Sequence, residues 1–136
     1  MEIRELTTRT ERREAVPVLR QLWTDESPSA VLEWTGADDY HLFGGEVGGE
    51  LVGVAGVLVR EVLHHDRHAW LYDLVVDEGH RGNGHGTALV EFVEDWAAER
   101  DCAAVALASP LGKEDVHEYY ADRGYETWGY VVEKEL

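Results

Sequence analysis

The stretch DLVVDEGHRGNGHGT, residues 73–87, joins a predicted strand to a predicted helix. The strand is the run AWLYDLVV at residues 69–76, which is rich in aromatic and β-branched side chains. Between strand and helix, three of the five residues 82–86 are glycine, so successive backbone N–H groups can converge there. The helix covers about residues 84–100, and one of its faces carries Leu89, Phe92, Val93, Trp96 and Ala97. Together with the positive end of the helix, the turn predicts a cradle for an anion such as phosphate.

Two common phosphate-binding motifs do not fit this turn. A dinucleotide-binding turn has the pattern GxGxxG, and its third glycine would fall at Thr87. A P-loop needs a lysine after its last glycine, and the turn contains no lysine. The remaining pattern is Arg81, two residues, Gly84, one residue and Gly86, directly after a strand.

The N-terminal part predicts a short strand followed by two helices. The strand covers residues 2–6, and Thr8 or Thr10 is the expected cap of the first helix. Pro17 falls inside the helical pattern, so we expect the helix to start or bend there. A second short helix stops near Gly36.

The middle of the chain predicts antiparallel strands. Residues 40–47 and 50–59 are strand-like runs joined by Gly48 and Gly49, which is typical of a tight hairpin. The segment EVLHHDRH at residues 61–68 is expected to be a polar turn before the strand at 69–76.

The C-terminal part predicts two further strands around a helix. AAVALA at residues 103–108 is expected to be a short strand buried on both faces. Residues 113–123 form the next predicted helix, which Gly124 stops, and residues 125–136 are expected to end the chain as a strand. Residues 69–107 then form one strand-helix-strand crossover.

This order of elements predicts a fold of the α/β (α+β) class, with a mixed sheet flanked by helices. At 136 residues the chain is long enough for one core and too short for two ordinary domains. We therefore expect a single domain over residues 1–136.

The pattern from Arg81 to Gly86 resembles the pyrophosphate-binding motif of the GNAT superfamily of N-acetyltransferases. That motif is usually Arg or Gln, two residues, Gly, one residue, and Gly or Ala. Residues 74–77, LVVD, look like the family's fourth strand, and YYADRGY at residues 119–125 is similar to its Phe-Tyr-Glu-Lys-Leu-Gly-Phe-like segment. The resemblance covers nearly the whole chain, strongly over residues 70–125 and weakly before residue 40. It implies a mostly antiparallel central sheet flanked by about four helices, in a GNAT-like arrangement.

The resemblance also implies that the chain binds acetyl-coenzyme A. Backbone N–H groups of the turn would hold the pyrophosphate, and Arg81 would add positive charge. The strand backbone at Leu74, Val75 and Val76 would pair with the pantetheine arm and polarise the thioester carbonyl. The implied pyrophosphate-binding residues are Arg81, Gly82, Asn83, Gly84, His85, Gly86 and Thr87.

Two residues are candidates for catalysis. The resemblance implies that Tyr120 donates a proton or a hydrogen bond to the thiolate of coenzyme A; the alternative is a core aromatic residue. Asp73 is a carboxylate inside an otherwise apolar strand, where an unpaired charge is costly. It is a candidate general base for the amine, directly or through water, and a carboxylate that is structural and satisfied, or that simply lies on the wet face, is an equally good interpretation. By position alone, Glu61 and His68 are weaker candidates.

These observations predict an N-acetyltransferase that moves an acetyl group to a primary amine of a small molecule or peptide. The alternative is a non-catalytic acyl-coenzyme A-binding module of the same fold. The acceptor stays unidentified. In the family, the region that corresponds to residues before 70 builds the acceptor site, and this is the part of the chain where the resemblance is weakest. Trp34 lies where the family's acceptor cleft is usually lined. The oligomeric state is open, and a homodimer is one alternative.

The charge of the chain narrows its partners and its compartment. Asp and Glu number 28 against 12 Lys and Arg, and the formal net charge is −16. Because no run of Lys or Arg offsets this charge, we expect no general binding of nucleic acid. No stretch reaches the roughly 18 apolar residues of a membrane span, and we expect a cytoplasmic protein without membrane association.

The residues that bind metals or form disulfides give weak patterns. Cys102 is the single cysteine, so an intramolecular disulfide is excluded. His64, His65 and His68 gather in one turn without a cysteine, which is a poor zinc pattern. We therefore expect no metal.

Repulsion among the carboxylates should destabilise the fold at low salt, and at molar salt the Debye length falls to about 3 Å. We expect a halophilic protein whose melting temperature rises with KCl concentration; the alternative is an ordinary acidic mesophile protein. Thermal unfolding followed by circular dichroism from about 0.1 M to about 3 M KCl measures the difference. A melting temperature independent of KCl would contradict the high-salt origin.

Overall fold

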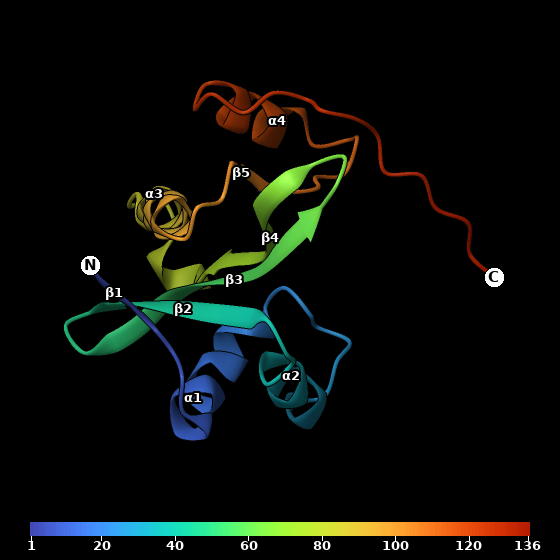
Figure 1. The fold of residues 1–136 in the computed structure, drawn as a ribbon. Coiled ribbons are helices and arrows are strands. Elements are labelled where there is room, and N and C mark those ends of the chain that lie inside the picture. Colours follow the sequence, from blue (N-terminus) through green and yellow to red (C-terminus); the bar gives the residue numbers. More distant parts are fainter. The chain divides into compact units, whose positions relative to one another are not determined.

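The computed structural model describes residues 1–136 as two compact units, residues 1–106 and 107–136. The first unit contains one five-stranded sheet with the order β1-β2-β3-β4-β5 (Figure 1). Its strands are β1 (Glu2–Glu5), β2 (Tyr40–Val47), β3 (Glu50–Val62), β4 (Asp66–Val76) and β5 (Ala104–Ala106). Its helices are α1 (Arg9–Leu19), α2 (Pro28–Thr35), the 3-10 turn η1 (Glu78–His80) and α3 (His85–Glu99). Neighbouring strands are antiparallel except β4 and β5, so the predicted mixed, mostly antiparallel sheet and its crossover are confirmed.

Helices cover both faces of this sheet, with α1 and α2 on one face and α3 on the other (Figure 1). Under α1 and α2 the core includes Leu19, Leu42 and Val54. On the opposite face the Phe43 ring lies 5.1 Å from the Trp96 ring of α3. The middle of β3 is buried between the two helical layers, which explains its uninterrupted apolar sequence.

The first helix starts earlier than its proline suggested. Thr8 caps α1 in a capping box with Glu11, so the helix begins at Arg9 and runs through Pro17 to Leu19. The expectation that Pro17 starts the helix is wrong. Since the capping box already fixes the first turn, the loss of one N–H donor near the other end does not prevent the helix from forming.

The two hairpins of the sheet differ in how well their turns were predicted. Gly48 and Gly49 have φ values of 59° and 83°, which matches the tight turn expected between β2 and β3. The polar segment 61–68 is mostly strand, because β3 extends to Val62 and β4 begins at Asp66. The expected long turn is therefore wrong. This end of the hairpin is largely exposed, so polar side chains cost little there.

Strand β5 is shorter and less buried than expected. It pairs with β4 only from His68 to Trp70, and Ala104 is exposed. The prediction of a strand buried on both faces over residues 103–108 is therefore wrong. As a consequence, residues 71–76 of β4 have no strand partner on the β5 side.

The second unit contains α4 (Glu114–Ala121), and Gly124 follows it with a φ of 90°. Residues 125–136 contain no helix or strand, so the expected final strand is wrong. Alternation of Trp128, Tyr130 and Val132 is a strand pattern, but a strand also needs a hydrogen-bonded partner, which a local pattern cannot specify.

No helix of the structure has both the length and the apolar character needed to cross a membrane.

Candidate active site

The glycine-rich turn leads directly into α3. Gly82 and Gly84 have φ values of 82° and 81°, a left-handed conformation that disfavours residues with a side chain. Gly84 is the N-cap of α3, and no side chain caps this helix end. Backbone N–H groups of the first helical turn therefore meet no competing side-chain acceptor from the cap position.

Gly86 is glycine for a different reason. It lies in α3 with an ordinary helical φ, and a Cβ there would lie 3.7 Å from Cγ2 of Val76, which is normal contact. Neither the backbone nor the packing requires glycine, although glycine costs a helix about 1 kcal/mol relative to alanine. A missing side chain at this position therefore fits a group that approaches the helix end closely, as a phosphate would.

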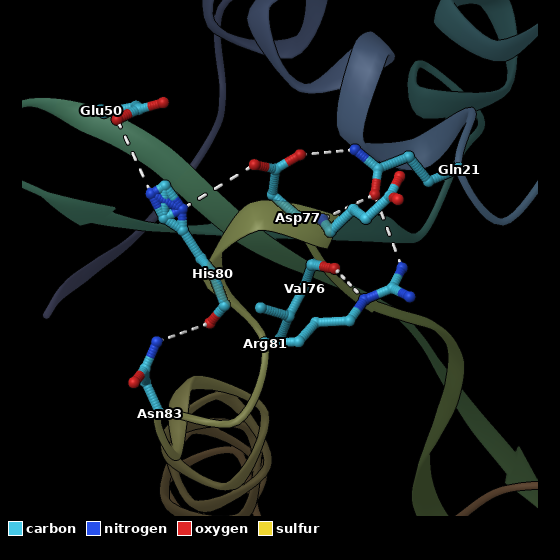
Figure 2. Close-up of polar contacts among 8 residues, drawn as sticks. Gln21, Glu50, Val76, Asp77, His80, Arg81 and Asn83 are labelled. Carbon is cyan, nitrogen blue, oxygen red and sulfur yellow. Dashed lines mark hydrogen bonds and ion pairs between the residues drawn. The ribbon is translucent and has the colours of Figure 1, made fainter.

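Arg81 is exposed beside the turn and is held by two acceptors (Figure 2). Its Nε donates to the carbonyl oxygen of Val76 at 2.9 Å, and its Nη2 lies 3.5 Å from Oε1 of Gln21. Asn83 Nδ2 donates to the carbonyl oxygen of His80 at 3.2 Å. The guanidinium, the two left-handed glycines and the start of α3 thus occupy one short segment.

Gln21 is a site residue that the sequence did not reveal. It follows α1, and its Oε1 also accepts from the backbone N–H of Glu78 at 3.0 Å, while its Nε2 donates to Oδ1 of Asp77 at 2.5 Å (Figure 2). The contacts join residues more than 50 positions apart in sequence. No local pattern signals such a contact.

The predicted pantetheine-binding segment, Leu74 to Val76, lies on the part of β4 that has a strand partner on one side only. On one side these residues pair with β3, where Val76 faces Gly53 and Leu74 faces Ala55. On the other side β5 has already ended. Backbone groups that face this side have no strand to bond, so they are suited to the amides of an extended ligand.

The Asp73 carboxylate is buried, with 1% of the residue exposed. Its Oδ1 accepts from Nε1 of Trp23 at 2.8 Å, and its Oδ2 accepts from the hydroxyl of Tyr40 at 2.6 Å. A Cβ on Gly56 would lie 1.8 Å from the Tyr40 hydroxyl oxygen, so the contact requires glycine at that position. Burial, with the adjacent Asp73 charge, raises the pKa of Tyr40 above its ordinary value. Each oxygen of Asp73 thus accepts one hydrogen bond, and the role of Asp73 as a base stays a prediction.

The weaker candidates for the base lie elsewhere. Glu61 is exposed in the β3–β4 hairpin, and its Oε2 lies 3.9 Å from Nη1 of Arg67. His68 is 4% exposed, and its ring stacks on His65 at 4.2 Å. No three His, Cys, Asp or Glu side chains gather so as to hold a metal ion.

Tyr120 lies on α4, in the second unit. Its ring lies 5.1 Å from that of Tyr119 and 5.2 Å from that of Tyr125. Burial is the main cause of a raised pKa at Tyr120; Arg123 acts in the opposite direction. The hydroxyl is therefore protonated at neutral pH and able to donate a proton or a hydrogen bond.

A comparison with protein families matches residues 2–125 to the model of the Acetyltransferase (GNAT) family. The chain belongs to this family. It is 28% identical over 137 residues to an uncharacterized N-acetyltransferase, YhdJ, of Bacillus subtilis (strain 168), covering 97% of this chain and 96% of the relative. The family suggested by the turn is thus confirmed, and the chain is an acetyltransferase.

Solved structures share the fold of this GNAT protein at low sequence identity. The aminoglycoside N-acetyltransferase AAC(6')-Iy in complex with CoA matches with a TM-score of 0.84 and 20% identity, covering 99% of this chain and 93% of that one. A ribosomal-protein-alanine N-acetyltransferase from Brucella melitensis biovar Abortus 2308 matches with a TM-score of 0.83 and 21% identity, covering 98% of both chains.

Proposed function

We propose that this GNAT protein transfers the acetyl group of acetyl-coenzyme A to a primary amine of a small molecule or peptide. Family membership and the neighbour in complex with CoA support acetyl-coenzyme A as the cosubstrate. The observation that carries the proposal is Gly86, whose missing side chain is required by neither its backbone nor its packing. It stands where the turn, Arg81 and the open edge of β4 meet.

In this proposal the chain's residues bind and orient a thioester. Acetyl-coenzyme A, when bound, supplies the activated acetyl group. The pyrophosphate is bound by the backbone of residues 82–87, which comprises Gly82, Asn83, Gly84, His85, Gly86 and Thr87, while Arg81 supplies charge. Backbone groups of Leu74, Val75 and Val76 hold the pantetheine arm and polarise the carbonyl. Tyr120 donates its proton to the departing thiolate.

Asp73 is the general base in this proposal. Because Asp73 is buried, with 1% of the residue exposed, the amine proton reaches it through the Tyr40 hydroxyl or a bound water. No single residue identifies the acceptor amine. The net charge of −16 favours a cationic amine by long-range attraction at low salt.

The remaining properties are also proposals. A family match over residues 2–125 spans both compact units, which supports one domain over residues 1–136. The acidic surface supports a halophilic protein working in a high-salt cytoplasm without nucleic-acid or membrane partners. We propose a homodimer as the assembly of this chain.

An assay of binding and turnover tests the function. Isothermal titration with coenzyme A measures binding, and thiol release from acetyl-coenzyme A with a panel of primary amines measures transfer. An enzyme shows both, whereas binding without turnover for any amine would favour the non-catalytic acyl-coenzyme A-binding module. Failure to bind coenzyme A would refute both.

Within this assay, Tyr120→Phe should lower kcat by about a hundredfold, since the thiolate loses its proton donor. Binding of coenzyme A should change little, because the ring remains. Tyr119→Phe, on the same helix, is the matched control and should keep its turnover. Equal turnover of wild type and Tyr120→Phe would leave Tyr120 as a core aromatic residue.

The role of Asp73 is tested by the dependence of rate on pH. A general base acts only in its deprotonated form, so Asp73→Asn should remove the part of the pH dependence that the base supplies. Tyr40→Phe should have the same effect if its hydroxyl carries the proton. A pH–rate profile that keeps its shape in Asp73→Asn would rule out the base and leave a structural carboxylate.

Substitutions of Gly86 separate helix stability from ligand binding. The family motif also allows alanine at this position, so Gly86→Ala should keep coenzyme A binding, and the free energy of unfolding should rise by about 0.5–1 kcal/mol because alanine favours the helix. Gly86→Val should weaken coenzyme A binding by about tenfold or more, because its larger side chain occupies space beside the phosphates. Gly84→Ala is the control for the backbone, and its positive φ predicts a lower melting temperature. Unchanged affinity in Gly86→Val would show that the phosphates do not bind beside residue 86.

A further inference from the structure

We infer that Gln21 is a positioning residue of the pyrophosphate cradle, which acts by holding Arg81 and binding the carboxylate of Asp77. The inference rests on the proposed function, since it assumes a ligand with a pyrophosphate at the turn. It adds a residue from the segment that follows α1 to a site that is otherwise built from residues 74–87.

The contacts of Gln21 reach three points of the connection between β4 and α3 (Figure 2). Its Oε1 accepts from the backbone N–H of Glu78 at 3.0 Å and lies 3.5 Å from Nη2 of Arg81. Its Nε2 donates to Oδ1 of Asp77 at 2.5 Å. One carboxamide therefore fixes the start of the turn and gives the Arg81 guanidinium a second acceptor besides Val76.

An amide side chain suits position 21 better than a charged side chain would. Asp77 and Glu78 bring two carboxylates to the entrance of a site for an anion, where they would repel it. The Nε2 donor binds Asp77 on one side, and Nδ1 of His80 lies 3.8 Å from the other oxygen of that carboxylate. A carboxylate at position 21 would repel Asp77, and an ammonium could not accept from Arg81.

The backbone around Gln21 is fixed before any ligand binds. Its N–H donates to the carbonyl oxygen of Val18 at 3.1 Å, so it continues the last turn of α1. Two residues later, the Trp23 indole donates to buried Asp73 of β4. The segment is thus attached to α1 on one side of Gln21 and to the sheet on the other, which lowers the entropy cost of presenting its side chain.

A double-mutant cycle on coenzyme A binding tests the inference. Gln21→Ala should weaken binding about five- to tenfold by isothermal titration, since Arg81 loses its orientation. In an Arg81→Ala background the same change should have little further effect, because the group it positions is absent. Circular dichroism and melting temperatures check that all four proteins fold. Unchanged affinity in Gln21→Ala, or equal losses in both backgrounds, would overturn the positioning role.

A charge exchange gives an independent test. Gln21→Glu should weaken coenzyme A binding most at low salt, because two carboxylates then face each other at 2.5 Å in the present geometry. Adding Asp77→Asn restores a donor opposite the new carboxylate, and the double variant should regain most of the affinity. Thr10→Glu adds the same charge on the exposed surface near the start of α1 and should leave binding unchanged. No recovery in the double variant would overturn the Asp77 contact.

The two hypotheses fail in different ways. Wild-type protein that binds no coenzyme A defeats the proposed function itself. Wild-type protein that binds it, with affinity insensitive to position 21, defeats only the inference about Gln21.

Discussion

Strand β4 is paired along its length with β3 but over only three residues with β5. This asymmetry leaves residues 71–76 of β4 without a strand partner on one side, where their backbone groups need other hydrogen-bond partners. The glycine-rich turn follows that strand after the 3-10 turn η1. An extended ligand could therefore satisfy the open edge with its amides while its phosphates reach the start of α3. The proposed acetyl transfer depends on this shared end of β4.

Residue 73 of the same strand shows how the fold tolerates a buried carboxylate. Asp73 is hydrogen-bonded by Trp23 from the segment after α1 and by Tyr40 from β2, and Gly56 of β3 leaves room for the Tyr40 hydroxyl. Removing one donor would leave a buried oxygen unsatisfied, at a cost of about 1–3 kcal/mol. The carboxylate therefore links three parts of the chain, whether or not it also accepts a proton.

The parts of the fold that were predictable from sequence are those set by neighbouring residues. A tight turn with left-handed backbone favours glycine, so Gly48 and Gly49 indicated their hairpin directly, and the same holds for Gly82 and Gly84 in the turn before α3. Long-range contacts gave no such signal. Gln21 and Trp23 contact residues that lie 50 or more positions away in the sequence, and no local sequence pattern indicates those partners. The expected strand at residues 125–136 failed for a related reason, since its alternation describes a strand but not the neighbour it would need.

The acidic composition and the anion site are compatible because they act over different distances. Exposed carboxylates repel an approaching phosphate through a field that salt screens, and at molar salt it fades within about 3 Å. The proposed cradle would rely on short hydrogen bonds from backbone N–H groups, with one arginine and no lysine. Such donors keep their geometry when the long-range field is screened. A site built in this way suits a protein with a net charge of −16, because high salt weakens the repulsion more than it weakens the binding contacts.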